Sequence, residues 1–108
     1  MDRIAFLTEF IQSNPHDLFS KHALALEWIK QGDDDHALKL FHEILSIDPQ
    51  YVGSYYHMAK LQERVQGGQA AMDTYHLGIK VAESIHDQHA LRELKSALQQ
   101  LTDEMEGY

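Results

Sequence analysis

The sequence predicts an all-α fold of about six helices, built by stacking helical hairpins of one kind. Residues 18–49 and 52–83 are two copies of one pattern, so that each position of the first copy has a counterpart at a fixed offset in the second. A fixed period of this length is typical of stacked, equivalent supersecondary units. Apolar residues follow helical spacing along the 108 residues, whereas the alternation expected of strands is absent over any useful length.

The two copies agree in residue size where paired helices should meet. Small residues let two helices approach closely, and aromatic residues fill the wider gaps between units. The equivalent pairs are Leu24 and Met58, Ala25 and Ala59, Ala37 and Ala71, and Phe41 and Tyr75.

The first half of the chain predicts three helices. Residues 2–13 form the first, which ends at Asn14-Pro15 because a residue before proline avoids the α region. Asp17 is the expected N-cap of a helix over 18–31, which Gly32 ends. The acidic run Asp33-Asp34-Asp35 favours the start of a third helix, since carboxylates pair with unbonded N–H groups there; it continues to about Ile47.

The second half repeats this arrangement and then departs from it. One helix is expected over 52–65 and its mate over 69–84, with Gly67-Gly68 as the turn. Glu83 stands where the first copy has Pro49, so this mate can continue for another turn. Asp87 is the expected N-cap of a last helix over 88–105. Its apolar stripe consists of Leu91, Leu94, Leu98, Leu101 and Met105.

Composition narrows the class of partner. Seventeen acidic and nine basic residues give a formal charge of −8, which disfavours nucleic acid and anionic membrane surfaces. The chain has no cysteine, no apolar run long enough to cross a bilayer, and no N-terminal segment resembling a signal peptide. These features predict a cytoplasmic protein.

The repeat resembles the tetratricopeptide repeat family, which has the same period. The first copy matches its pattern through Lys21, Leu24, Ala25, Trp28, Ala37, Phe41 and Pro49. The second matches through Tyr55, Met58, Ala59, Ala71 and Tyr75, and departs at Gln62 and Glu83. This resemblance implies a right-handed α-α superhelix forming one domain over residues 1–108. Its expected parts are a half-repeat helix (2–13), two repeats (18–49 and 52–85) and a capping helix (87–106).

The resemblance also implies a function and a site. In this family the first helix of each unit lines a concave groove that binds a peptide or a helix of another protein. The groove positions fall on Phe19, His22, Leu26, Ile29, Lys30, Tyr56, Lys60, Glu63 and Arg64. Some relatives bind C-terminal carboxylates, but His22, Leu26 and His57 stand at key clamp positions without an asparagine. We do not expect that specificity here.

Two alternatives stay open from the sequence. Leu26 and Ile29 can instead pack beneath the N-terminal helix and leave the groove filled. The chain can also self-associate as a homodimer whose assembly is the functional unit.

No enzyme, cofactor or metal site is expected. The sequence lacks nucleophile-elbow, P-loop, H-E-x-x-H and dinucleotide motifs. Among eight histidines only His86 and His89 are closely spaced, and they span a proposed helix start. Glu27 and Glu63 are expected to be surface charges, not a catalytic pair.

Overall fold

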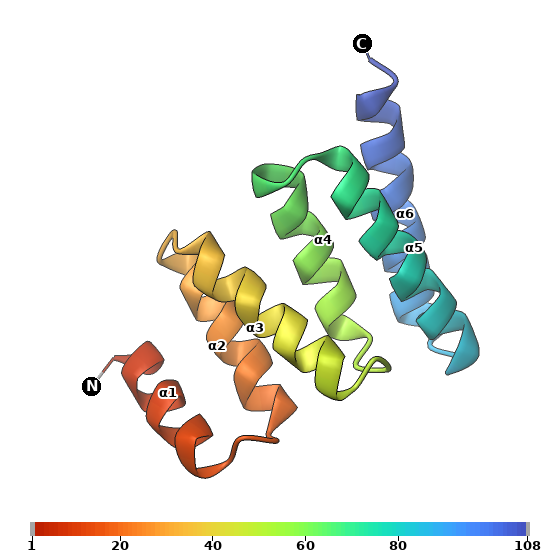
Figure 1. Ribbon diagram of the computed structural model, residues 1–108. Coiled ribbons are helices and arrows are strands. Elements are labelled where there is room, and N and C mark those ends of the chain that lie inside the picture. Colours follow the sequence, from red (N-terminus) through yellow and green to blue (C-terminus); the bar gives the residue numbers. More distant parts are fainter. Residues whose placement is uncertain (1, 108) are drawn as a thin grey trace. The chain divides into compact units, whose positions relative to one another are not determined.

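A computed structural model describes residues 2–107, and this part of the chain contains six helices and no strand. The helices are α1 (Arg3–Ser13), α2 (Leu18–Lys30), α3 (Asp34–Ile47), α4 (Gly53–Val65), α5 (Gly68–Ser84) and α6 (Gln88–Met105) (Figure 1). The all-α class and the number of helices expected from the sequence are confirmed. No helix in this part is long and apolar enough to span a membrane.

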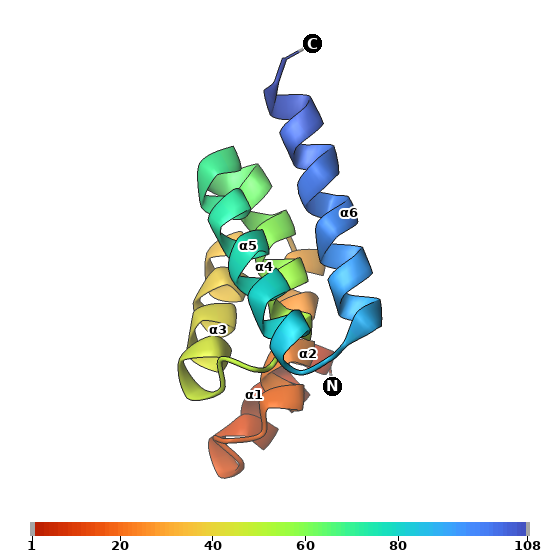
Figure 2. The same cartoon turned by 90° about the vertical axis from the view of Figure 1, so that its right-hand side faces the viewer.

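The chain divides into two compact units. The first unit is Met1–Asp48, in which α2 packs against both α1 and α3. The second unit is Pro49–Tyr108, in which α5 packs against both α4 and α6, and α4 also touches α6 (Figure 2). Each unit therefore contains three helices, of which the central one (α2 or α5) packs against the other two.

Four helices begin at an aspartate that accepts a backbone hydrogen bond three residues later. Asp17 accepts from Ser20 at 3.0 Å and Asp33 from His36 at 3.2 Å. Asp87 accepts from Ala90 at 2.9 Å, as the sequence predicted. Asp2 does the same for Ala5 at 2.9 Å. The first helix therefore starts at Arg3, because Asp2 is the cap and lies outside the helix.

The second unit starts its helices α4 and α5 without such caps. The helix expected from residue 52 begins at Gly53, and the one expected from residue 69 begins at Gly68. Gly67 precedes α5 with a φ of 95°, a left-handed conformation that glycine adopts readily. The turn thus needs one glycine, and the other joins the helix.

The repeated small residues lie at the centre of the packing. Ala25, Ala37, Ala59 and Ala71 are completely buried, as are Phe41 and Tyr75. Lys21, which stands where the repeat pattern has an aromatic residue, is also buried, and its Nζ lies 3.7 Å from Oε2 of Glu43 on α3. Its alkyl chain replaces part of the missing ring while its charge reaches a partner.

The packed face of α6 differs from the predicted leucine stripe. Its buried residues are Ala90, Leu94, Ala97 and Leu101, whereas Leu91 and Leu98 are half-buried. Met105 is 48 % exposed. Leu94 and Leu101 of the stripe are buried as expected, and Ala90 and Ala97 shift the packed face by part of a turn toward the alanine side.

Candidate functional site

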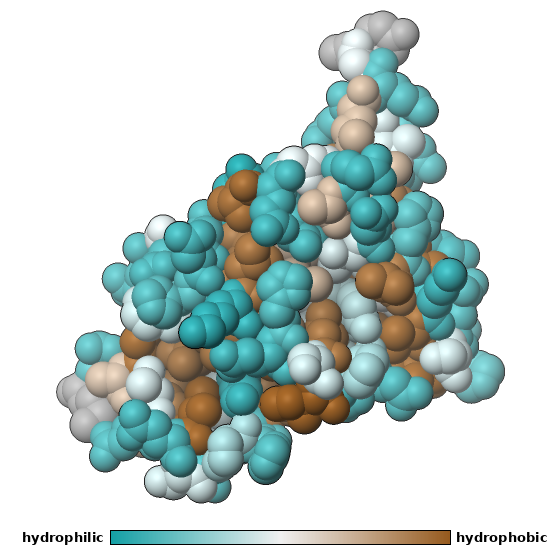
Figure 3. Space-filling view, viewed as in Figure 1, coloured by the Kyte–Doolittle hydropathy of each residue, from teal (hydrophilic) through white to brown (hydrophobic). Residues whose placement is uncertain are grey.

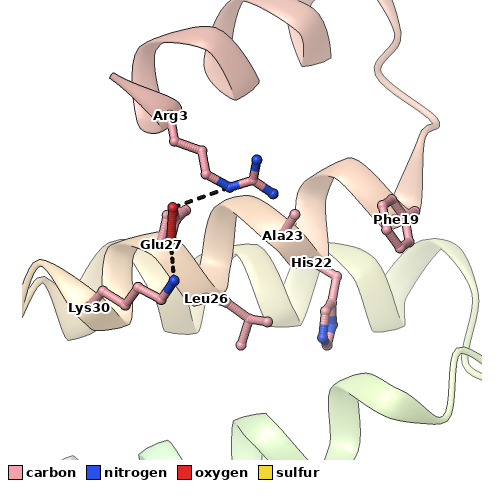
Figure 4. Close-up of a pocket in the computed structure, with 7 residues that line it drawn as sticks. All are labelled: Arg3, Phe19, His22, Ala23, Leu26, Glu27 and Lys30. Carbon is pink, nitrogen blue, oxygen red and sulfur yellow. Dashed lines mark ion pairs between the residues drawn. The ribbon is translucent and has the colours of Figure 1, made fainter. Parts of the chain in front are cut away.

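A pocket of about 260 Å³ opens on the first unit beside α2. It is lined by Arg3 of α1 and by Phe19, His22, Ala23, Leu26, Glu27 and Lys30 of α2 (Figure 4). The residues of α2 recur every three or four positions, which places them on one helix face. Four of the five positions expected on this helix share the pocket. The fifth, Ile29, is half-buried and does not line it.

The lining of the pocket includes apolar side chains that reach solvent. Leu26 is half-buried and Phe19 is 75 % exposed, so both present apolar surface to an incoming group. His22 contacts Phe41 edge-on, with ring centroids 5.7 Å apart and planes at 67°. Because Phe41 is completely buried, this contact ties the orientation of the imidazole to the core. Figure 3 shows apolar surface gathered over α1 and α2.

Charged groups border the pocket around Glu27. One oxygen of its carboxylate lies 3.2 Å from Nε of Arg3, and the other lies 3.2 Å from Nζ of Lys30. The Glu27 side chain is only 14 % exposed, whereas those of Arg3 and Lys30 are 62 % and 75 % exposed. Glu27 is therefore a half-buried charge with two ion-pair partners. It holds two cations at the rim, and this trio has a net charge of one positive unit.

The four positions expected on α4 lie in the second unit. Tyr56, Lys60 and Glu63 are half-buried, and Arg64 is exposed. Nζ of Lys60 lies 3.8 Å from Oε2 of Glu63. The Tyr56 ring meets that of His57 edge-on, with centroids 5.4 Å apart.

A buried residue of α5 forms a hydrogen bond with Glu63. The Tyr75 hydroxyl donates a 2.5 Å hydrogen bond to Oε2 of Glu63. Burial raises the pKa of the Tyr75 phenol well above its ordinary value, and the hydrogen bond to Glu63 raises this pKa further. Glu63, like Glu27, is thus a half-buried charge with partners on its own helix and on a neighbouring one.

Neither α2 nor α4 places its functional groups in a metal-binding cluster. Residues 2–107 contain no group of three or more His, Asp or Glu side chains that could hold a metal ion. His86 lies after α5 with a φ of 59°, and His89 lies in the first turn of α6; both are exposed. The side chains on α2 and on α4 can offer apolar contacts, hydrogen bonds and fixed charges to a bound molecule.

Solved structures resemble this chain along most of its length. A tetratricopeptide repeat domain protein from Salinibacter ruber, known from a crystal structure, is 42 % identical, with a TM-score of 0.76. The match covers 81 % of this chain and 97 % of that one. A solution structure of a tetratricopeptide repeat domain protein from the same organism is 44 % identical over 81 % of this chain and 88 % of its own, with a TM-score of 0.77.

A more distant structure shares the fold alone. The TPR2B domain of yeast Sti1, in a complex with pHsp70, is 19 % identical. It has a TM-score of 0.85 over 94 % of this chain and 81 % of its own. No protein-family model and no curated protein sequence matches the chain.

Proposed function

We propose that this chain, which belongs to the tetratricopeptide repeat family, is a non-enzymatic interaction module that binds a peptide or a helix of another protein. The observation that carries the proposal is the α2 pocket, in which Phe19, His22, Leu26 and Lys30 converge. The complex of the yeast TPR2B domain with pHsp70 supports a protein partner for this fold.

The size of the pocket favours a single side chain as its occupant. Pockets for cofactors and other small molecules usually measure roughly 300–1,000 Å³, and this one measures about 260 Å³. An aliphatic or aromatic side chain of the partner would rest on Phe19 and Leu26. Groups beside that anchor would meet the rim formed by Arg3, Glu27 and Lys30.

The α4 positions are proposed as a set of polar contacts on the second unit. Tyr56 offers an aromatic ring and a hydroxyl, and Lys60 and Arg64 offer cations. Oε2 of Glu63 accepts a 2.5 Å hydrogen bond from the Tyr75 hydroxyl and lies 3.8 Å from Nζ of Lys60. Glu63 therefore orients the Lys60 ammonium group and can accept hydrogen bonds from a partner. Ile29 is the weakest of the proposed contact residues because it does not line the pocket.

A capture experiment with charge-matched variants tests the pocket. The tagged chain is incubated with lysate of its source cells, and retained proteins are identified by mass spectrometry. The test variant is Phe19→Asp with Lys30→Glu. The control is Leu77→Asp with Lys80→Glu on α5, which changes the net charge equally and also replaces exposed residues. Circular dichroism confirms that both variants stay folded.

We expect the test variant to lose partners that the wild type and the control retain. Adding Tyr56→Ala with Lys60→Glu to the wild type tests the contribution of α4 in the same way. Partner sets that are identical for the wild type and the Phe19 variant would refute the α2 pocket as the binding site.

A further inference from the structure

Helix α1 has a second apolar side next to its packed side. Leu7 is buried and Ile4 and Ile11 are half-buried, whereas Phe6 and Phe10 are 55 % and 39 % exposed. The spacing of four residues places the two phenylalanines on one helix face. Their rings lie nearly parallel, with centroids 6.5 Å apart and planes at 19°.

These rings form a surface separate from the α2 pocket. Phe6 and Phe10 line a pocket of about 330 Å³ together with Glu9, Ser13 and Asn14. None of these five residues lines the pocket described above. We call this set the α1 outer face.

The repeat indicates what kind of element fits there. One repeat further along the chain, Phe10 corresponds to Ile44 of α3, and Phe6 corresponds to Leu40. Ile44 is completely buried and Leu40 is half-buried. The same positions are thus more covered in α3 than in α1. A helix with apolar residues four positions apart would cover Phe6 and Phe10 by ridges-into-grooves packing.

We propose that the α1 outer face binds a basic amphipathic helix of another protein. Charge complementarity at Glu9 argues for a basic partner. Glu9 is exposed, and its carboxylate forms no hydrogen bond or ion pair within residues 2–107. The only cation of α1, Arg3, pairs with Glu27. An arginine or lysine of the partner therefore finds an available carboxylate next to two aromatic rings, which also attract cations.

The same charges disfavour a second copy of this chain as the occupant. A two-fold symmetric interface places one patch against itself, so each Glu9 would approach the other. Each copy also has a formal charge of −8, which opposes association. A basic helix would avoid both the approach of two Glu9 carboxylates and the repulsion between two acidic copies.

Two synthetic helices that differ in charge test the proposal. Both are alanine-based peptides of equal length with the same leucines four residues apart; one has flanking arginines and the other flanking glutamates. Each is titrated into the ¹⁵N-labelled chain while amide chemical shifts and dissociation constants are measured. The variants are Glu9→Gln, Phe6→Ala and Phe10→Ala, with Leu77→Ala on α5, which also truncates an exposed apolar side chain, as the control.

We expect the arginine peptide to shift the amides of residues 6–14 and to bind at least tenfold more tightly than the glutamate peptide. Glu9→Gln should weaken binding about threefold and each α1 phenylalanine variant about tenfold, whereas Leu77→Ala should have no effect. Phe6→Ala keeps the test valid if Phe10→Ala alters the fold.

Three results would overturn the proposal. They are equal binding of the two peptides, shifts confined to residues 19–30, and an absence of shifts at millimolar peptide. Concentration-dependent shifts at residues 6–14 without peptide would identify a second copy as the occupant and overturn it as well. The α2 proposal is independent, because its capture experiment leaves Phe6 and Phe10 intact.

Discussion

The Thr74 hydroxyl donates a 2.5 Å hydrogen bond to the side-chain oxygen of Gln62 and so joins α5 to α4. Gln62 is 5 % exposed and Thr74 is 4 % exposed. Their counterparts in the preceding repeat are Trp28 and Leu40. One repeat therefore has an apolar pair where the other has a hydrogen-bonded polar pair, and this pairing accounts for the departure of Gln62 from the repeat pattern.

Replacing only one partner of this bond should destabilise the fold. Thr74→Val keeps a similar side-chain volume but removes the hydroxyl donor, so the buried side-chain oxygen of Gln62 loses this hydrogen bond. This loss should lower the free energy of unfolding by about 1–3 kcal/mol. Adding Gln62→Leu removes the polar group as well, so the double variant should lose less than the sum of the single losses. Urea unfolding followed by circular dichroism measures this cycle. Additive losses would show that the bond contributes no coupling.

Tyr75 should make the fold sensitive to alkaline pH. Its pKa is raised in the folded state by burial and by Glu63, so its contribution is intact below the unfolded pKa of about 10. Above about pH 10 the unfolded chain releases this proton and the folded chain keeps it. The free energy of unfolding should therefore fall by up to about 1.4 kcal/mol per pH unit from this group.

Tyr75→Phe provides the comparison. Urea unfolding between pH 9 and pH 11.5 should show a steeper decline for the wild type than for this variant. Absorbance at 295 nm should also show one tyrosine fewer ionised in the folded wild type than in urea at pH 11. Parallel declines would mean that Tyr75 ionises normally.

The helices and the buried alanines were predictable because they depend on local rules and on repeat phase. Asp17 and Asp87 precede apolar periodic segments, and each accepts the expected hydrogen bond. Ala25 and Ala59 occupy one phase of the repeat, and both are completely buried. Such features need only spacing and residue size.

The partners of the charged groups were not predictable in this way. Glu27 meets Arg3 from another helix, and Glu63 meets the Tyr75 hydroxyl across a buried contact. Which side chains meet depends on helix rotation and rotamer, which the residue pattern does not specify. The Glu27–Lys30 and Lys60–Glu63 pairs, each three residues apart on one helix, have a favourable spacing that the sequence alone displays.

The single tryptophan reports on the turn between α2 and α3. The Trp28 ring stacks on His36, with centroids 4.5 Å apart and planes at 20°. Nδ1 of His36 lies 2.8 Å from Oδ2 of Asp33. This hydrogen bond is the main reason that the pKa of Asp33 is lowered, so the Asp33 carboxylate stays ionised in mild acid.

Acidification below about pH 4 should therefore destabilise the fold. Because the folded pKa of Asp33 is lowered, its stabilisation is fully present above its unfolded pKa of about 4 and is lost as the pH falls through the folded pKa. Urea unfolding between about pH 6 and pH 3, followed by Trp28 emission, should show a steeper decline in the free energy of unfolding for the wild type than for His36→Ala, which lacks the side-chain hydrogen bond to Asp33. Equal declines in both would assign the effect to another carboxylate.

Gly78 allows α5 to pass close to both of its neighbours. A Cβ at this position would lie 2.7 Å from Cβ of Tyr55 and 3.1 Å from Cδ1 of Leu94. The first distance involves an atom bonded to the α4 backbone, so a rotamer change cannot relieve the contact. Gly78→Ala should therefore lower the free energy of unfolding by about 1–3 kcal/mol, although alanine favours a helix interior by up to about 1 kcal/mol.

Gly53→Ala is the matched control. Gly53 begins α4, and nothing lies within 4 Å of a Cβ built there. Without a steric conflict, the helical preference of alanine should leave stability unchanged or raise it by up to about 1 kcal/mol. Both variants are compared by urea unfolding. A stable Gly78→Ala variant would mean that α4 and α5 separate without cost, contrary to the close packing around Tyr55.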